Sequence, residues 1–193
     1  MSHDPTFWIL ARAAGLTAYL LLTASMVAGL TVKSRVLGKA VRPSAVTDVH
    51  KTLAVGGLLA LALHGAALVL DATVEVTPLA LLVPGLVDYR SWWTGAGVLA
   101  GELMALVTAS FWLRKRIGTR LWRHLHWLSY AAFLLATAHG LLAGSDANRP
   151  WAIAIYASAA GAVAAGTAWR GLRRAQSRPR PRRAPAPAPT VGA

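Results

Sequence analysis

Four histidines in the apolar part of the chain are the residues whose chemistry stands out. His50 and His64 bound the stretch HKTLAVGGLLALALH, whose only charged residue is Lys51. His126 and His139 bound HWLSYAAFLLATAH, in which no residue is charged. An imidazole in such a setting costs free energy unless it is paired or holds a ligand, so these four side chains call for a function.

The spacing of these histidines predicts two sites at different depths. Both stretches have the length and composition of helices that cross a bilayer in the same direction, with His50 and His126 at the inner side. His64 and His139 follow 14 and 13 residues later, about 20 Å further along a helix. Each depth therefore offers one imidazole from each helix. Axial ligation of a b-type haem uses two neutral imidazoles in this way, so the spacing predicts two stacked haems.

The helical phase leaves the inner ligand open. Fourteen residues return to within roughly 40° of the starting face, whereas thirteen leave an offset of roughly 140°. The helix from His126 to His139 is therefore either locally overwound or presents its two ligands from different sides. His124 lies fifteen residues before His139 and has a better phase, so it remains a rival to His126. Histidines that only hydrogen-bond neighbouring helices are the simpler interpretation for one residue, but not for four at matched depths.

The composition places the chain among membrane proteins. Of its 193 residues, 55% are hydrophobic and 14% are charged, whereas soluble domains carry about a quarter charged residues. The absence of cysteine excludes disulfides, thiolate metal sites, iron–sulfur clusters and covalent haem attachment. The net charge of +13 lies mostly in blocks that flank apolar runs, which is typical of topology signals and not of nucleic-acid binding.

Five apolar runs are long enough to cross a bilayer, which takes roughly 20 helical residues. They cover residues 7–32, 50–70, 92–113, 122–143 and 151–169. We therefore predict an all-α, multi-pass protein of the cell membrane with five transmembrane helices in a haem-binding bundle. The segment 71–91 contains TPLALLVPGLV, which is too short to span, and we expect it to lie at the interface over the outer mouth of the bundle.

The basic residues predict the orientation of these helices. They gather between the first two runs, between the third and fourth, and after the fifth, where the blocks are Lys33, Arg35, Lys39 and Arg42; Arg114, Lys115, Arg116, Arg120 and Arg123; and Arg170, Arg173, Arg174, Arg178, Arg180, Arg182 and Arg183. Because basic loops stay in the cytosol, residues 1–6 form a short extracytoplasmic N-terminus and the C-terminus is cytoplasmic. Residues 7–170 form the haem domain. Residues 171–193 read as a disordered, Pro/Ala-rich basic tail that contacts anionic lipids.

The stretch WRHLHWLSYAAFLLATAHG resembles a known family pattern, W-x-x-L-H-x-L-x-Y followed by a histidine 13 residues further on. That family is the transmembrane domain shared by ferric reductases, NADPH oxidases and the bacterial haem-binding subunit of the periplasmic methionine-sulfoxide reductase system. RAAGLTAYLL is similar to its first core helix, and the likeness extends over roughly residues 7–170. The resemblance implies two b haems that carry electrons from the cytosolic to the outer face, and it favours His126 over His124.

Ferric reductases and NADPH oxidases usually continue into flavin and NADPH domains, whereas a short basic tail follows here. We therefore expect the electron donor to be a separate cytosolic flavoprotein or membrane quinol. The stretch GAGVLA, residues 95–100, matches part of a dinucleotide fingerprint but lies inside an apolar helix with no preceding strand. It is better interpreted as glycine that packs helices together.

The predicted function is that of a di-haem b-type membrane cytochrome, either an oxidoreductase or an electron-transfer subunit of one. Its extracytoplasmic acceptor stays open among ferric iron, oxygen and a partner reductase. One alternative is the haem-binding membrane subunit of a two-component reductase such as methionine-sulfoxide reductase. A second alternative is a transporter or structural membrane protein whose histidines are incidental.

Three further residues have alternative roles. Arg12 lies near the depth of His64 and His139, where it would bind an outer haem propionate or form a salt bridge inside the bundle. Glu102 lies near mid-membrane and suits a proton or quinone role or a hydrogen bond between helices. Phe133 falls between His126 and His139 in the sequence, so it lies between the haems or simply packs in the core.

Overall fold

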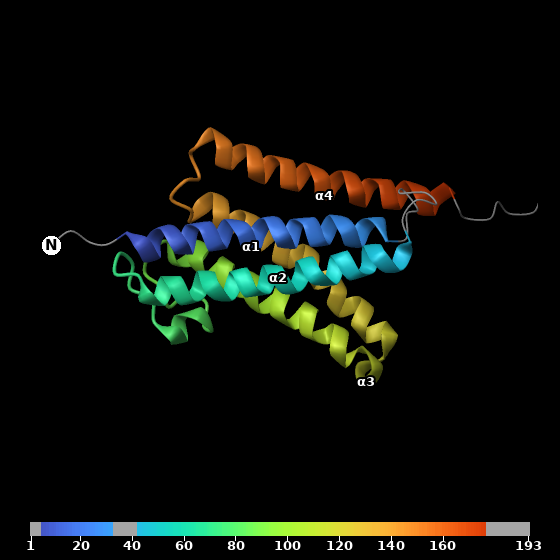
Figure 1. Ribbon diagram of the computed structural model, residues 1–193, viewed down its shortest axis with the longest axis horizontal. Coiled ribbons are helices and arrows are strands. Elements are labelled where there is room, and N and C mark those ends of the chain that lie inside the picture. Colours follow the sequence, from blue (N-terminus) through green and yellow to red (C-terminus); the bar gives the residue numbers. More distant parts are fainter. Residues whose placement is uncertain (1–4, 33–41, 177–193) are drawn as a thin grey trace, which may run out of the picture.

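The protein is built from long helices that run along one common axis (Figure 1). The computed structural model describes residues 5–32 and 42–176. In these ranges the helices are α1 Thr6–Thr31, α2 Pro43–Leu70, α3 Ser91–Leu142 and α4 Pro150–Gln176, with a short 3-10 helix, η1 Pro78–Leu81. Proline at the first position of α2 and of α4 suits a helix start, because its missing N–H would have no partner there.

The protein crosses the membrane several times. Within the described residues, α1, α2, α3 and the Pro150–Arg173 part of α4 are long and apolar enough to span a bilayer. Large apolar side chains point outward along them, as at Leu59, Trp112 and Leu134, which are 69%, 66% and 66% exposed. Lipid is the solvent that suits such a surface, and a helix satisfies its own backbone hydrogen bonds there.

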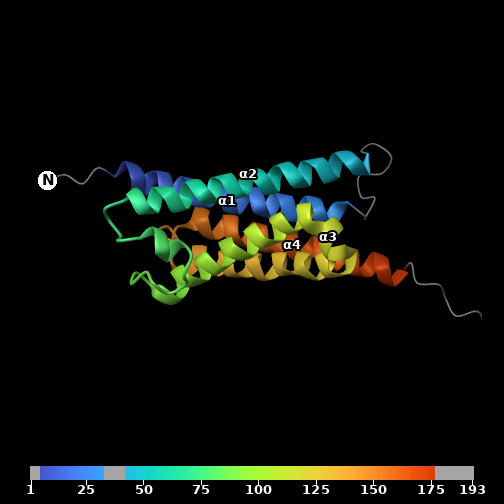
Figure 2. The ribbon, with the colours of Figure 1, turned by 90° about the horizontal axis from the view of Figure 1, so that it is seen from below.

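Helix α3 differs from the sequence prediction, which separated the runs 92–113 and 122–143. The structure joins them in one 52-residue element that is broken at Gly118, where φ is 80° and ψ is 154°. The chain turns back at this end of the molecule (Figures 1 and 2), so a first arm, 91–117, runs beside a second arm, 119–142. The described residues thus hold four long helical elements, and the two runs that were predicted separately correspond to the two arms of α3 on either side of Gly118.

Small residues allow the helices to approach closely. Helix α1 packs chiefly along α2, and Ala11, Ala14 and Ala18 of α1 are 1%, 5% and 3% exposed. A Cβ on Gly57 of α2 would lie 2.7 Å from Cγ of Leu22, so this position needs glycine. Short side chains let two backbones approach and gain van der Waals contact, which is how helices associate in lipid.

The predicted interfacial segment folds against the end of α2. Val76, Ala80 and Val87 form a small core with partly buried residues that include Leu68 and Leu81. The Thr77 hydroxyl accepts a 3.3 Å hydrogen bond from the Ala80 N–H and so caps η1. We call this end of the bundle the η1 end and the opposite end, where α3 turns back, the Gly118 end (Figure 2).

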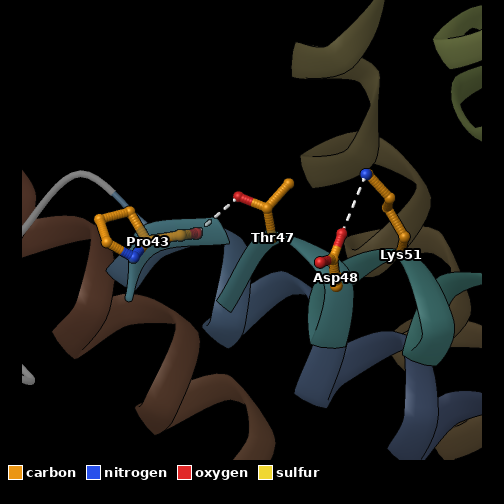
Figure 3. A network of polar contacts seen from close by, with 4 residues as sticks. All are labelled: Pro43, Thr47, Asp48 and Lys51. Atoms are coloured by element: carbon orange, nitrogen blue, oxygen red, sulfur yellow. Dashed lines mark hydrogen bonds and ion pairs between the residues drawn. The ribbon is translucent and has the colours of Figure 1, made fainter. Parts of the chain in front are cut away.

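Figure 3 shows how α2 begins at the Gly118 end. The Thr47 hydroxyl donates to the Pro43 carbonyl at 2.9 Å, and the Lys51 ammonium forms a 3.2 Å ion pair with Asp48. The Lys51 nitrogen also lies 5.1 Å from the ring centre of Phe111 on α3. The only charge in the His50–His64 stretch is therefore stabilised at the helix start.

Some predicted segments lie outside the described residues, and two predicted boundaries differ from the helix ends in the structure. Residues 1–4 and 177–193 lie outside them, and so does 33–41, which holds most of the first basic block. Helix α4 continues to Gln176, so residues 171–176, predicted as the start of the tail, are helical. Helix α1 likewise begins at Thr6, inside the predicted N-terminal segment.

Candidate functional site

The four histidines come together in two pairs. His50 of α2 faces His126 of the second arm of α3, with ring centres 6.0 Å apart and ring planes at 75°. His64 faces His139 in the same way, at 6.4 Å and 72°. We call the first the inner pair and the second the outer pair. The outer pair lies toward the η1 end, and both pairs join the same two helices.

Three of the four imidazoles are anchored through Nδ1 to main-chain oxygens of another helix or, for His139, of the other arm of α3. The bonds are His64 to the Ala11 carbonyl at 2.7 Å, His50 to the Ser25 carbonyl at 2.7 Å, and His139 to the Trp93 carbonyl at 2.8 Å. A carbonyl only accepts, so Nδ1 carries the proton and donates. In the neutral ring this leaves Nε2 with a free lone pair, which is the atom that a metal binds.

His126 has a different environment. In the described part of the chain its Nδ1 has no such carbonyl partner, and its ring instead lies 5.4 Å from that of Trp122, one turn earlier. The Trp122 indole N–H is buried there without a hydrogen-bond partner among the described residues. The rival ligand, His124, is exposed, and the imidazole across from His50 is that of His126.

The second arm presents its two histidines from different sides. His139 is hydrogen-bonded to the Trp93 carbonyl of the first arm. The His126 side faces α4, because Tyr130, one turn later, shares a 3.2 Å hydrogen bond with Thr167. Within α3 only Gly118 departs from helical dihedral angles. The thirteen-residue spacing is therefore accommodated without local overwinding, which is the second of the two alternatives that the phase allowed.

A cavity of about 1700 Å³ connects the two pairs and is lined by all four histidines. It exceeds the roughly 300–1,000 Å³ of a pocket for one drug-sized ligand, so it has room for more than one. Tyr19 and Phe133 also line it, with ring centres 5.9 Å apart. The Tyr19 hydroxyl also bonds the Thr137 hydroxyl at 3.0 Å. Phe133 thus packs against Tyr19 at the edge of this cavity.

The donor set fits a haem iron. A metal–imidazole bond is about 2 Å long, and a ring centre lies about 1.2 Å from its nitrogens, so two rings on opposite sides of one iron have centres about 6.4 Å apart. Two ring nitrogens joined directly by a hydrogen bond would bring the centres to about 5.2 Å. The observed 6.0 and 6.4 Å agree with the first value. No group of three or more His, Asp or Glu that could hold a metal occurs in ranges 5–32 and 42–176, so each pair would supply two ligands and a macrocycle the others.

Arg12 and Glu102 also line the cavity. Arg12 forms an ion pair with Asp146, which lies in the connection between α3 and α4. This contact corresponds to the salt-bridge alternative for Arg12, and it leaves the Arg12 side chain 41% exposed. Glu102 is an exposed residue on the first arm of α3.

Three glycines that the sequence analysis did not connect with the histidines lie directly against their rings. An added Cβ would be 2.9 Å from His64 Nδ1 at Gly15, 3.2 Å from His50 Cε1 at Gly29 and 2.6 Å from His139 Nδ1 at Gly97. Gly97 belongs to the GAGVLA stretch, which lies in a helix as expected. Gly15 and Gly29 are 14 residues apart, the spacing of His50 and His64, and this equality is the signal that would have identified them.

Comparison with known families agrees with this arrangement. The family described as "Ferric reductase like transmembrane component" matches residues 14–137, well over half of the 193 residues. The match includes His50, His64 and His126 and ends two residues before His139. No match was found among curated proteins or among solved structures. The chain therefore belongs to the ferric reductase like transmembrane component family, whose members suggest a role in membrane electron transfer.

Proposed function

We propose that the protein is a di-haem b-type cytochrome that carries electrons across the membrane. The observation that carries the proposal is the presence of two facing imidazole pairs on the same two helices, at 6.0 and 6.4 Å between ring centres. The inner pair would hold one haem and the outer pair the other. Bound haem supplies the reversible one-electron chemistry of its iron, which no side chain of this protein provides.

The chain's own residues hold, orient and shield this chemistry. The Nδ1 bonds of His50, His64 and His139 fix each ring so that Nε2 is the free nitrogen. Arg12 places a positive charge at the outer end of the cavity, where it suits a haem propionate as well as Asp146. Apolar and aromatic side chains such as Tyr19 and Phe133 line the space between the two pairs, and an apolar lining lowers the local dielectric constant.

The charge distribution supports an orientation for this electron path. Arg114, Lys115, Arg116, Arg120 and Arg123 flank Gly118, and the end of α4 brings Arg170 and Arg173 to the same end of the bundle (Figure 2). In the described residues the η1 end carries Asp71, Asp88 and Asp146 together with only three arginines, Arg12, Arg90 and Arg149, so the positive excess lies at the Gly118 end. We therefore propose that each arm of α3 crosses the membrane, which makes five crossings, with the Gly118 end in the cytosol and the N-terminus outside.

This orientation sets the direction of transfer. The donor would be a cytosolic flavoprotein or a membrane quinol that delivers electrons to the inner pair. The acceptor would meet the outer pair at the extracytoplasmic face and would be ferric iron or a partner reductase, with the methionine-sulfoxide type as the alternative. His64 and His139 would hold the outer haem, and the two imidazoles would supply an electron-transfer centre in place of an oxygen-binding one. The basic tail that follows α4, 177–193, would contact anionic lipids.

Transfer across a bilayer can be tested in proteoliposomes. The purified protein is reconstituted into vesicles that contain ferricyanide, and membrane-impermeant dithionite is added outside. We expect trapped ferricyanide to be reduced much faster than in protein-free vesicles, in either orientation of the protein. His64→Ala should slow this reduction toward the protein-free rate. Wild-type protein that carries its haems but reduces ferricyanide no faster than empty vesicles would contradict the proposal.

A further inference from the structure

The three Nδ1 bonds share one construction. Each imidazole donates from Nδ1 to a helix carbonyl and also lies against the glycine four residues after that carbonyl. The carbonyl–glycine pairs are Ala11 and Gly15, Ser25 and Gly29, and Trp93 and Gly97. Two of the pairs lie on α1 and serve the histidines of α2, and the third lies on the first arm of α3 and serves His139 of the second arm. A repeated construction of this kind indicates a common physical cause.

Helix geometry supplies that cause. A helical carbonyl at position i accepts from the N–H at position i+4 and keeps one lone pair free. The Cβ at i+4 points back toward the N-terminus and covers the turn that holds this carbonyl. Glycine at i+4 leaves the free lone pair open, so a planar ring from a neighbouring helix can reach it edge-on.

We propose that Gly15, Gly29 and Gly97 are positioning residues that select the Nδ1–H tautomer of His64, His50 and His139 and so decide which nitrogen faces the cavity. The inference rests on the proposed haem function, and it assigns the choice of ligating atom to residues that never touch the haem iron. We call each of these glycines, together with the carbonyl four residues before it, a seat.

The register of α1 and α2 fits two seats on one helix. Gly15 and Gly29 are 14 residues apart, as are His50 and His64, and the two helices run in opposite directions (Figure 2). The Ser25 hydroxyl donates a 3.0 Å bond to the main-chain oxygen of His50 and also lies 2.9 Å from its Nδ1, which adds contacts between the two helices at this register. Helix α1 therefore acts as a template for both ligands of α2.

The seats make the two pairs unequal. Both rings of the outer pair are seated, whereas the inner pair has one seated ring, His50, and one unseated ring, His126. An imidazole that donates from Nδ1 to a carbonyl is a more basic ligand. Disturbing a seat should therefore raise the midpoint potential of the haem at that pair.

The clearances predict a graded response to alanine. The closest approach of an added Cβ is 2.6 Å at Gly97, 2.9 Å at Gly15 and 3.2 Å at Gly29. Real Cβ atoms essentially never come nearer than 3.0 Å, so Gly97→Ala and Gly15→Ala must displace the ring. At Gly29 the ring needs to shift by only a few tenths of an ångström. Two glycines serve as controls: Gly161, where an added Cβ meets nothing within 4 Å, and Gly56, where it is 3.7 Å from Leu21.

The experiment measures haem per chain by pyridine haemochrome and both midpoint potentials by redox titration, on monodisperse purified protein. Gly97→Ala and Gly15→Ala should lose the outer haem and retain about one haem per chain. Gly29→Ala should keep two haems and raise only the inner potential. Gly56→Ala and Gly161→Ala should match the wild type in both measurements.

Two results would refute the role of the seats. The first is two haems with unchanged potentials in Gly97→Ala and Gly15→Ala, and the second is an unchanged inner potential in Gly29→Ala. If those variants do not stay monodisperse, Gly29→Ala decides, and an unchanged inner potential refutes the inference. A wild-type protein without haem would instead refute the proposed function, so the two failures are distinguishable.

Discussion

The break at Gly118 yields a prediction that isolates backbone conformation from packing. With φ of 80° and ψ of 154°, Gly118 occupies a region that is essentially restricted to glycine and costs other residues about 1–3 kcal/mol. An added Cβ meets nothing within 4 Å at Gly118, and the same holds at Gly161 of α4. The two glycines therefore differ in backbone conformation and not in the space available to a methyl group.

Gly118→Ala should destabilise the protein by about 1–3 kcal/mol through this strain. Gly161→Ala, in a regular helix, should stabilise it by about 0.5–1 kcal/mol, because alanine loses less conformational freedom on folding. The expected difference between the variants is thus about 1.5–4 kcal/mol, of opposite sign relative to the wild type.

Equilibrium unfolding in mixed micelles, followed by far-UV circular dichroism, measures both changes against the wild type. A Gly118→Ala variant as stable as Gly161→Ala would refute the reasoning. It would mean that the chain passes from one arm of α3 to the other without the observed dihedral angles at Gly118.

Three other predictions follow from the site. His64→Ala or His139→Ala should remove the outer haem alone, so the haem absorbance of purified protein falls by about half; loss of both haems from either change would contradict two separate pairs. His124→Ala should leave the haem content intact, and loss of one haem in a pyridine haemochrome assay would make it the inner ligand in place of His126. Tyr19→Phe removes a partly buried 3.0 Å hydrogen bond to Thr137 and should cost about 0.5–1.5 kcal/mol in micelle unfolding with haem content unchanged; a loss of haem would instead give the hydroxyl a role in binding.

Local patterns predicted the features of this protein that depend on spacing along one helix. The 14- and 13-residue intervals were enough to expect His50 and His64 opposite His126 and His139, because a helix has a fixed rise. Apolar length likewise predicted the helices. The break at Gly118 was hidden in a basic segment that was interpreted as a loop, although a single glycine in a glycine-only conformation is enough to reverse the chain.

Contacts between distant segments were harder to predict. The partner of Arg12 is Asp146, 134 residues away in sequence, and no local pattern connects them. The phase of His126 and His139 depended on which neighbour each faces, namely α4 or the first arm of α3. The matching intervals of Gly15 and Gly29 were visible in the sequence, but their meaning required knowing that α1 lies beside α2.

A dithionite-reduced minus oxidised spectrum of the detergent-purified protein, with haem quantified per chain as the pyridine haemochrome, tests the central claim most directly. The protein is expressed with haem supplied to the culture. A sharp b-type α-band with close to two haems per chain is the predicted result. A colourless protein would contradict the account and return the four histidines to helix packing.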